Sequence, residues 1–278
     1  MAKRADKQMM ESERRKAAFD SFYRSIWSER YDALREALLK EASPSEFRGF
    51  LSKSYYLDRA SVLVASLLPI KEGDNVLDMC AAPGGKSLVL LSRAEGKITL
   101  TANDRSPDRK LRLDNVLKEH TPEEWHENIK TTCRDASVWG LHEKDAYDAI
   151  LLDAPCSSER HVLQSEKHMA MWSPSRPKRL AIEQYALLAS ALMAVKPGGY
   201  ILYSTCSVNS AEDEGVIEKL MKRKNDEAEI IPIELEGSEE RPYGRAIMPD
   251  TADNMGPLYA CLIRKRNEQD SNSRMHTV

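Results

Sequence analysis

Alternation of strand-like and helix-like segments is the feature that most constrains how this chain can fold. From Asn75 onward, short apolar runs with the composition of buried β-strands alternate with segments that have the period of amphipathic helices. The expected strands are residues 76–80, 98–103, 129–134, 147–153 and 200–204, and the expected helices between them include residues 86–92, 107–120 and 179–195. Because neighbouring parallel strands need a long crossover connection, usually a helix, this order predicts a parallel sheet with helices on its faces.

Two further strands are expected near the end of the chain, at residues 229–235 and 258–264. A capping-box pattern, residues 210–213, is expected to open the helix that precedes them. The last strand follows a loop without a crossover helix, so we expect it to pair antiparallel with its neighbour. The whole pattern predicts an α/β fold built on a doubly wound, mostly parallel sheet of seven strands. Ligands of such sheets bind at the carboxyl ends of the strands.

The segment before the sheet is expected to be a small helical extension. Residues 10–40 carry apolar side chains at the spacing of one buried helical stripe, and Ser43-Pro44-Ser45 interrupts that pattern. We expect domain boundaries that separate this extension from the sheet and from a polar, disordered tail, at residues 1–60, 61–266 and 267–278.

Composition and charge exclude several classes of protein. Hydrophobic residues make up 41% and charged residues 31% of the chain, as in a globular domain rather than a disordered one. The longest apolar run, residues 62–70, is too short to span a bilayer. The N-terminus lacks the features of a signal or transit peptide, so we expect a cytoplasmic protein. The net charge of −3 argues mildly against nucleic-acid binding. Basic clusters near residues 3–16 and 176–179 can still form local basic surfaces that bind nucleic acid.

The five cysteines include two in informative positions. No Cys-x-x-Cys pair is present, which argues against a zinc site and a disulfide scaffold. Cys156 and Cys206 follow the fourth and fifth strands, where two thiols facing one crevice indicate reactivity rather than packing alone. Cys206 is also expected just before a helix start, where the dipole would favour a thiolate. The others, Cys80, Cys133 and Cys261, fall on expected strands and are predicted to be packing residues.

A turn of small residues joins the first strand to its helix. It matches neither the phosphate-binding loop nor the Gly-x-Gly-x-x-Gly dinucleotide fingerprint. Backbone N–H groups at such a helix start suit a carboxylate or hydroxyl ligand, although a tight turn without a ligand would look the same. The segment is Cys80-Ala81-Ala82-Pro83-Gly84-Gly85-Lys86-Ser87.

Acidic residues stand at the ends of three successive strands. Asp104 and Asp135 come directly after the second and third strands, and Asp153 is the last residue of the fourth. A carboxylate after the second strand is placed to accept hydrogen bonds from ribose hydroxyls. One such Asp is often only a helix cap, but three beside a glycine turn indicate a nucleoside cofactor.

Five sequence blocks closely resemble the Nop/Sun family of RNA 5-methylcytosine methyltransferases. The blocks are VLDMCAAPGGKS, TANDRSPDRKLRL, LLDAPCSS, KPGGYILYSTCS and NMGPLYACLIRK, and the resemblance runs in order over residues 55–266. Paired Asp-x-Pro-Cys and Ser-Thr-Cys motifs at this spacing are highly specific. Three short segments, ANDRSP, SSERH and NMGPLY, are most similar to the mitochondrial small-subunit rRNA member and its bacterial relatives.

The resemblance implies a Rossmann-like class I methyltransferase fold with S-adenosyl-L-methionine as its cofactor. The glycine turn would hold the methionine end of the cofactor, Asp104 and Arg109 the ribose, and Asp135 with Ala136 the adenine. The complete implied cofactor set is Cys80, Ala81, Ala82, Pro83, Gly84, Gly85, Lys86, Ser87, Asp104, Arg109, Asp135, Ala136 and Asp153.

The resemblance also implies catalytic roles for Cys206, Cys156, Asp153 and Lys86. Carbon 5 of cytosine is too electron-poor to attack a methyl group directly, and addition of a thiolate at C6 makes C5 nucleophilic. Cys206 would be this nucleophile, Cys156 would help release the product, and Asp153 would hold the cytosine. In place of the common Pro-Cys-Ser-Gly-x-Gly pattern, this chain has Ser158 and Arg160 at the glycine positions, which puts the local backbone shape in question.

The resemblance implies that the partner is RNA, and small-subunit rRNA in particular. Neither a metal nor a membrane is expected. Arg176, Lys178 and Arg179 follow the Trp-Ser-Pro loop, where they either bind phosphates or form a solvated helix start. A basic helix start opposes the helix dipole, which favours the phosphate role. Further RNA affinity would come from the N-terminal helices or from a protein partner.

Two alternatives remain open. A DNA cytosine-5 methyltransferase would use the Pro-Cys cysteine as nucleophile, but it would carry a large target-recognition domain and would leave Ser-Thr-Cys unexplained. A non-catalytic rRNA-binding assembly factor would keep the fold without turnover, which the intact cysteines and glycine turn disfavour. Methyl transfer from labelled cofactor distinguishes these functions.

Overall fold

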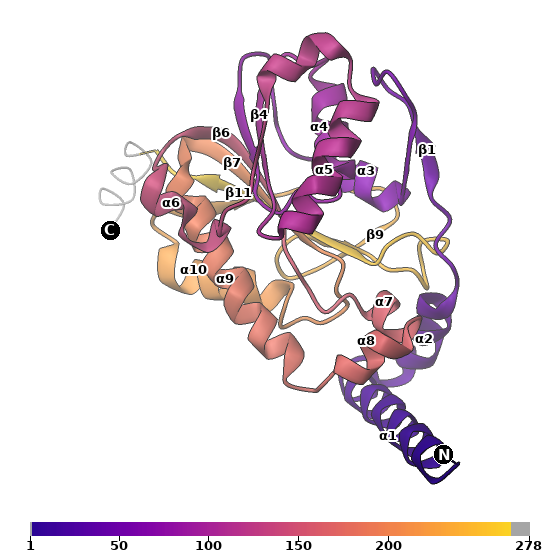
Figure 1. Ribbon diagram of the computed structural model, residues 1–278. Coiled ribbons are helices and arrows are strands. Elements are labelled where there is room, and N and C mark those ends of the chain that lie inside the picture. The colour runs from indigo at the N-terminus through magenta and orange to yellow at the C-terminus, as the bar shows by residue number, and fades with distance from the viewer. Residues whose placement is uncertain (1, 268–278) are drawn as a thin grey trace, which may run out of the picture.

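A central twisted sheet with helices on both faces forms the body of the computed structural model, which describes residues 2–267 (Figure 1). Side chains are described from residue 10 onward. The helices are α1 (Ala2–Trp27), α2 (Tyr31–Leu39), α3 (Arg59–Ala65), α4 (Gly85–Arg93), α5 (Pro107–His120), α6 (Trp139–His142), α7 (Glu159–Leu163), α8 (Glu166–Met171), α9 (Arg176–Ala194) and α10 (Glu214–Lys224). The strands are β1 (Ser45–Phe47), β2 (Tyr55–Leu57), β3 (Asn75–Asp78), β4 (Thr99–Asn103), β5 (Ile129–Thr132), β6 (Tyr147–Asp153), β7 (Val195–Thr205), β8 (Ala228–Ile231), β9 (Ser238–Glu240), β10 (Arg245–Ile247) and β11 (Leu258–Lys265).

The sheet has the predicted doubly wound order. Its strands follow the order β5-β4-β3-β6-β7-β11-β10-β9, and β8 pairs with β11. Strands β3 to β7 are parallel to their neighbours, whereas β11 is antiparallel to β7, which confirms the prediction for the last strand. All seven predicted strands are present. The short strands β9 and β10 were not predicted, and β10 shares the second edge of β11 with β8.

Two hydrophobic cores lie on opposite faces of the sheet because strand side chains alternate in direction. On β6, Ile150 and Leu152 belong to the core beneath α6, α9 and α10. Their neighbours Ala149 and Leu151 belong to the other core, beneath α3, α4 and α5. Burial on both faces explains the nearly continuous apolar sequence of this strand.

The N-terminal helices pack against the loops that follow β6 and β7. Phe19 and Tyr23 of α1 contact the ring of Trp172, with ring centroids 5.0 and 6.3 Å from it. The Trp27 indole donates a hydrogen bond to the Val208 carbonyl. Figure 1 shows α1 and α2 beside α7 and α8. The predicted extension is therefore joined to the sheet domain by a shared core, and the predicted tail lies, apart from Asn267, outside the described residues.

Some local predictions were wrong. The capping box at residues 210–213 does not form: α10 begins at Glu214, and the Asp213 carboxylate accepts a hydrogen bond from Thr205 instead of capping the helix. Residues 196–199, which lie between the predicted helix 179–195 and the predicted strand 200–204, belong to β7, and its register with β6 shifts there. Helices α7 and α8 were not predicted, since each is shorter than two turns. Among the helices of residues 2–267, none is long and apolar enough to cross a membrane.

Candidate active site

The carboxyl ends of β6 and β7 bring the two predicted reactive cysteines together. Asp153, the last residue of β6, is paired in register with Ser204 of β7. Cys156 and Cys206 follow these positions by three and two residues, so the strand register fixes where both loops begin. Their Sγ atoms lie 3.1 Å apart. Both thiols are free; Cys156 is buried and Cys206 is partly buried.

An ion pair stands beside the thiols. Lys86 donates from Nζ to Oδ2 of Asp153 at 2.7 Å, and the Ser204 hydroxyl donates to Oδ1 at 2.8 Å. Burial alone would lower the pKa of Lys86, but the attraction of Asp153 outweighs it and raises that pKa. In this pair Asp153 can only accept hydrogen bonds, while Lys86 places a positive charge at the crevice.

The surroundings of the two thiols drive their pKa values apart. The hydrogen bond with Cys156 lowers the pKa of Cys206, burial opposes this, and a hydrogen bond from Ser158 lowers it further. The pKa of Cys156 is raised, first by its hydrogen bond to Cys206 and then by burial. Cys206 is thus the better thiolate, and Cys156 retains its proton. The expected helix start at Cys206 is not the cause, because α10 begins only at Glu214.

Two cavities meet at Cys80. One, of about 220 Å³, lies against the ends of β3 and β4. Its lining includes the predicted residues Cys80, Asp135 and Ala136. The other, of about 170 Å³, lies over the turn after β3. Its lining includes the predicted residues Cys80, Ala81, Ala82, Pro83, Gly85, Lys86 and Asp153. Cys80, predicted as a packing residue and also part of the implied cofactor set, packs against the core and borders both cavities.

Within the glycine turn, the residues have different tasks. Gly84 has φ +121°, and a Cβ there would lie 3.0 Å from Val116 of α5, so glycine permits both the turn and the packing of α4 on α5. The Ser87 hydroxyl is fully buried and donates to Oδ2 of Asp78 at 2.7 Å. Ser87 therefore holds Asp78 and does not border either cavity.

Asp78 is a site residue that the sequence analysis missed. It lines the second cavity, and its Oδ1 atom is buried without a hydrogen-bond partner among the residues that the structure describes. Burial raises the pKa of Asp78 to about 7. The sequence predicted the first strand at residues 76–80, which put Asp78 inside the strand, whereas in the structure β3 ends at Asp78.

Asp104 and Arg109 lie side by side at the end of β4. The Asp104 carboxylate is buried, accepts a hydrogen bond from the Ser106 backbone at 2.9 Å and lies 3.2 Å from the Arg109 guanidinium. Asp135 is exposed at the first cavity, where hydrogen bonds from the Ser137 hydroxyl and backbone lower its pKa. Asp135 and Asp153 thus each border one of the two cavities, whereas Asp104 lies at the end of β4 and lines neither of them.

Two buried carboxylates behind the thiols were also missed. Glu159 and Glu212 are fully buried, and both lie 3.1 Å from the Ser207 hydroxyl. Glu159 also accepts hydrogen bonds from the Tyr23 hydroxyl and the Val208 backbone, and Glu212 accepts one from the Ser157 backbone. Burial, followed by repulsion from Glu212, raises the pKa of Glu159 to about 7. The pair ties the loops after both cysteines to each other and to α1.

Cys133 and the basic cluster complete the set of predicted residues. Cys133 is exposed, so its prediction as a packing residue was wrong, whereas Cys261 is buried as expected. At the start of α9, Arg176 is partly buried and Lys178 and Arg179 are exposed. None of the three forms an ion pair with a side chain of residues 10–267.

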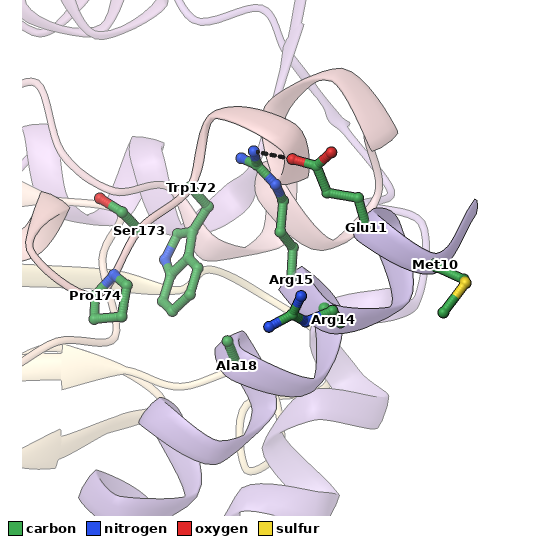
Figure 2. Close-up of a pocket in the computed structure, with 8 residues that line it drawn as sticks. All are labelled: Met10, Glu11, Arg14, Arg15, Ala18, Trp172, Ser173 and Pro174. Atoms are coloured by element: carbon green, nitrogen blue, oxygen red, sulfur yellow. Dashed lines mark hydrogen bonds and ion pairs between the residues drawn. The ribbon is translucent and has the colours of Figure 1, made fainter. Parts of the chain in front are cut away.

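A larger cavity of about 550 Å³ lies next to this cluster, between α1 and the loop before α9. In Figure 2, Arg14 and Arg15 of α1 face Trp172, Ser173 and Pro174 across it. Arg15 is bound to Glu11 at 2.8 Å, and its other nitrogen donates to the Ala170 carbonyl.

Comparison with known proteins gives concordant matches. The family model described as 16S rRNA methyltransferase RsmB/F matches residues 65–264. The 5-cytosine rRNA methyltransferase NSUN4 of Mus musculus is 35% identical over 232 residues, which are 76% of this chain and 60% of that protein. The mitochondrial tRNA (cytosine(34)-C(5))-methyltransferase of Danio rerio is 34% identical over 239 residues, 80% of this chain and 63% of that protein.

A solved structure shares the fold. A methyltransferase homolog from Pyrococcus horikoshii superposes with a TM-score of 0.69 at 22% identity, covering 88% of this chain and 93% of that one. The chain spans less than two thirds of the length of the mouse and zebrafish proteins. Since the family model covers most of the sheet domain, the resemblance to the Nop/Sun family is confirmed, and this chain belongs to the RsmB/F family of 16S rRNA methyltransferases.

Proposed function

We propose that this protein is an S-adenosyl-L-methionine-dependent RNA cytosine-5 methyltransferase. The observation that carries the proposal is the pair of free thiols, 3.1 Å apart, beside the Lys86–Asp153 ion pair at the carboxyl edge of the sheet. One thiol with a lowered pKa next to one with a raised pKa suits a reaction that needs a nucleophile and a separate proton-transfer group. Family membership and the mouse relative, a 5-cytosine rRNA methyltransferase, support the same reaction.

In the proposed reaction, the Cys206 thiolate forms a bond from Sγ to C6 of the cytosine. The electron pair of the C5–C6 double bond moves to make C5 nucleophilic, and C5 takes the methyl group that the cofactor supplies. A base then removes the C5 proton, the C5–C6 double bond returns, and the Sγ–C6 bond breaks with the thiolate leaving. The lowered pKa of Cys206 serves both its attack and its departure.

Cys156 is proposed to assist the second half of this sequence. Its thiol is in hydrogen-bond contact with Cys206. Because the pKa of Cys156 is raised, Cys156 keeps its proton while Cys206 attacks as a thiolate. Once Cys206 is bound to C6, the Cys156 thiol no longer donates to a thiolate. It can then release its own proton to solvent and take the C5 proton as a thiolate, or it can orient a water that takes the C5 proton. This order assigns attack to the loop after β7 and release to the loop after β6.

Asp153 and Lys86 are proposed to hold the base and balance its charge. The Asp153 carboxylate can accept a hydrogen bond from the exocyclic amino group of cytosine. The Lys86 ammonium lies in the same cavity, where it stabilises negative charge that develops on the ring as Cys206 adds. A cytosine that enters this crevice must be single-stranded or flipped out of a helix.

The cavities fit the cofactor by their donor and acceptor groups. The unpartnered Asp78 oxygen can accept from the ammonium of the methionine end, which explains an otherwise unsatisfied buried atom. Asp104 at the end of β4 can accept from ribose hydroxyls, and the first cavity beside Asp135 and Ala136 has an apolar wall that suits an adenine.

Replacing Asp104 with alanine should weaken cofactor binding by roughly 1.5–3 kcal/mol, the range for hydrogen bonds to a charged group. Titration calorimetry of the cofactor against each variant measures this. Asp226→Ala is the matched control, because that carboxylate is exposed in the turn after α10. Wild-type affinity in Asp104→Ala would remove Asp104 from the site.

The RNA is proposed to be small-subunit rRNA, bound in part by Arg176, Lys178 and Arg179. These side chains have no ion pair within residues 10–267, and Arg14 of α1 lies across the neighbouring cavity (Figure 2). Further affinity would come from the N-terminal helices or a protein partner. The tRNA activity of the zebrafish relative makes tRNA the substrate to test beside rRNA. The cytoplasmic location stays a prediction.

Replacing Arg176, Lys178 and Arg179 together with alanine should flatten the salt dependence of RNA binding. For single-stranded RNA, the slope of log K against log salt should fall by about 0.7 for each lost phosphate contact. The control variant replaces Lys219, Lys222 and Arg223 of α10, which removes the same charge from another surface. Equal slopes for wild type and the α9 variant would identify the cluster as solvated surface.

The activity itself is tested by transfer of labelled methyl groups from the cofactor to isolated small-subunit rRNA, with tRNA in parallel. Bisulfite sequencing then locates any 5-methylcytosine. We expect a single modified cytosine in the rRNA. Binding of cofactor and rRNA without transfer to either RNA would instead support a non-catalytic assembly factor.

A further inference from the structure

Ser158 occupies the space immediately beside both thiols. Its hydroxyl oxygen lies 3.3 Å from Sγ of Cys206 and 3.5 Å from Sγ of Cys156. Its backbone has φ +54°, in the left-handed region that glycine adopts most readily. The structure thus answers the question that the missing glycine raised: serine takes the conformation expected of glycine and adds a hydroxyl at the reacting atoms.

The hydroxyl can give only one hydrogen. Its neighbours are the two sulfur atoms and the Cys156 carbonyl, which is also 3.5 Å away. The shortest of these distances is to Cys206, and a charged acceptor forms the stronger hydrogen bond. When Cys206 is a thiolate, the single hydrogen of Ser158 is therefore best given to it.

We propose that Ser158 is a positioning residue that donates a hydrogen bond to the Cys206 thiolate and stabilises it independently of Cys156. The inference rests on the proposed function, in which Cys206 is the nucleophile. It assigns to this chain a thiolate donor that a glycine at the same position could not supply.

The second donor matters most when the product is released. At that stage the Sγ–C6 bond breaks and its electron pair returns to Cys206. If Cys156 has just directed removal of the C5 proton, its own hydrogen is not reliably aimed at the departing sulfur. Ser158 takes no part in proton transfer, so its hydroxyl still faces Cys206 and stabilises the leaving thiolate.

The other groups that face Cys206 do not replace this hydroxyl. Cys156 donates the first hydrogen bond to Cys206, the charge of Asp153 opposes the thiolate, and the charge of Lys86 favours it. Lys86 is itself bound to Asp153, so its ammonium is directed to the carboxylate. Two hydrogen-bond donors, from Cys156 and Ser158, thus meet the sulfur directly within the described residues.

The test follows the rate at which iodoacetamide alkylates Cys206 as pH rises, in Ser158→Gly and Ser158→Ala. Both variants are made in a Cys133→Ser background, because Cys133 is exposed. Cys156 and Cys206 fall in different tryptic peptides, so mass spectrometry follows them separately. Below the pKa of the thiol, we expect alkylation of Cys206 to slow roughly tenfold, and at alkaline pH the rates should converge on that of the background enzyme.

Comparison of the variants separates the hydroxyl from the backbone. Glycine accepts the positive φ and alanine does not, so a lost hydroxyl predicts the same pH profile in both. The control is Ser210→Ala, whose exposed hydroxyl lies in the loop before α10. Combining Ser158→Gly with Cys156→Ala should slow alkylation beyond either change alone.

A pH profile of Cys206 alkylation in Ser158→Gly that matches the background enzyme would overturn the proposal. A change confined to Ser158→Ala would do the same, because it would reflect strain. The assay contains neither RNA nor cofactor, so its outcome is separate from the proposed function. Absence of methyl transfer by the wild-type enzyme would refute the function while leaving the thiolate measurement intact.

Discussion

Replacing Cys206 with alanine is expected to reduce methyl transfer to background. The variant cannot form the bond to C6, so C5 of the cytosine never becomes nucleophilic. Removing the nucleophile of a covalent mechanism costs on the order of 10⁴-fold or more in turnover, which places the residual rate below detection in a labelled-methyl assay. Cofactor affinity, measured by calorimetry, should remain at the wild-type value because Cys206 lines neither of the two cavities proposed for the cofactor.

Cys133→Ala is the matched control for this loss. Cys133 is an exposed cysteine whose thiol contacts the Arg105 carbonyl, far in sequence from both reactive loops. It should retain the full rate. A Cys206→Ala variant that transfers methyl groups at a rate close to that of Cys133→Ala would exclude Cys206 as the nucleophile.

Replacing Cys156 with alanine should have a different consequence: the covalent complex forms and is not released. Cys206 keeps its nucleophilic sulfur, Ser158 at 3.3 Å and Lys86 nearby, so attack and methyl transfer can still occur. The step that removes the C5 proton lacks its assisting group. Enzyme incubated with RNA and cofactor should therefore accumulate as a slower band on a denaturing gel.

The double variant identifies the thiol that forms the complex. Cys156→Ala combined with Cys206→Ala should show no slow band, because the remaining loops contain no nucleophile for C6. In a DNA-type mechanism the roles of the cysteines reverse. A slow band in Cys206→Ala together with none in Cys156→Ala would overturn the assignment while leaving the fold unchanged.

The sequence predicted the sheet well because its strands have a strong local signal. The run Ala149-Ile-Leu-Leu is apolar at every position since β6 is buried on both faces, and few other structures require that pattern. The order of strands and helices was enough to predict the edge of the sheet at which the site lies. Asp104, Asp153, Cys156 and Cys206 lie at strand ends, and parallel strands bring their carboxyl ends to one edge.

What the sequence could not predict depends on contacts between distant segments. Glu159 and Glu212 are 53 positions apart, and only the packing of two loops against α1 buries them together. Strand β10 is three residues long, and its existence depends on the open edge of β11 rather than on its own composition. Asp78 was overlooked because the predicted strand 76–80 ran two residues beyond the end of β3, so Asp78 did not stand at a predicted strand end.

Two predictions failed for the same physical reason: the capping box at residues 210–213 and the helix start just after Cys206. A short pattern such as Ser210-Ala-Glu-Asp indicates a helix cap only if no tertiary partner competes for its side chains. Here Asp213 is bound by Thr205, so the helix starts later and contributes nothing at Cys206. Hydrogen bonds from Cys156 and Ser158 lower the pKa of that thiol instead, and neither contact has a signature in the local sequence.

The most direct test of the account is to identify the cysteine that bonds to the target base. RNA containing 5-fluorocytosine has no C5 proton to lose, so the adduct formed by wild-type enzyme and cofactor should persist. Nuclease and trypsin digestion followed by mass spectrometry then reads which peptide carries the modified nucleotide. The account predicts the peptide that contains Cys206, with the Cys156 peptide unmodified; a nucleotide on Cys156, or an adduct on neither cysteine, would contradict it.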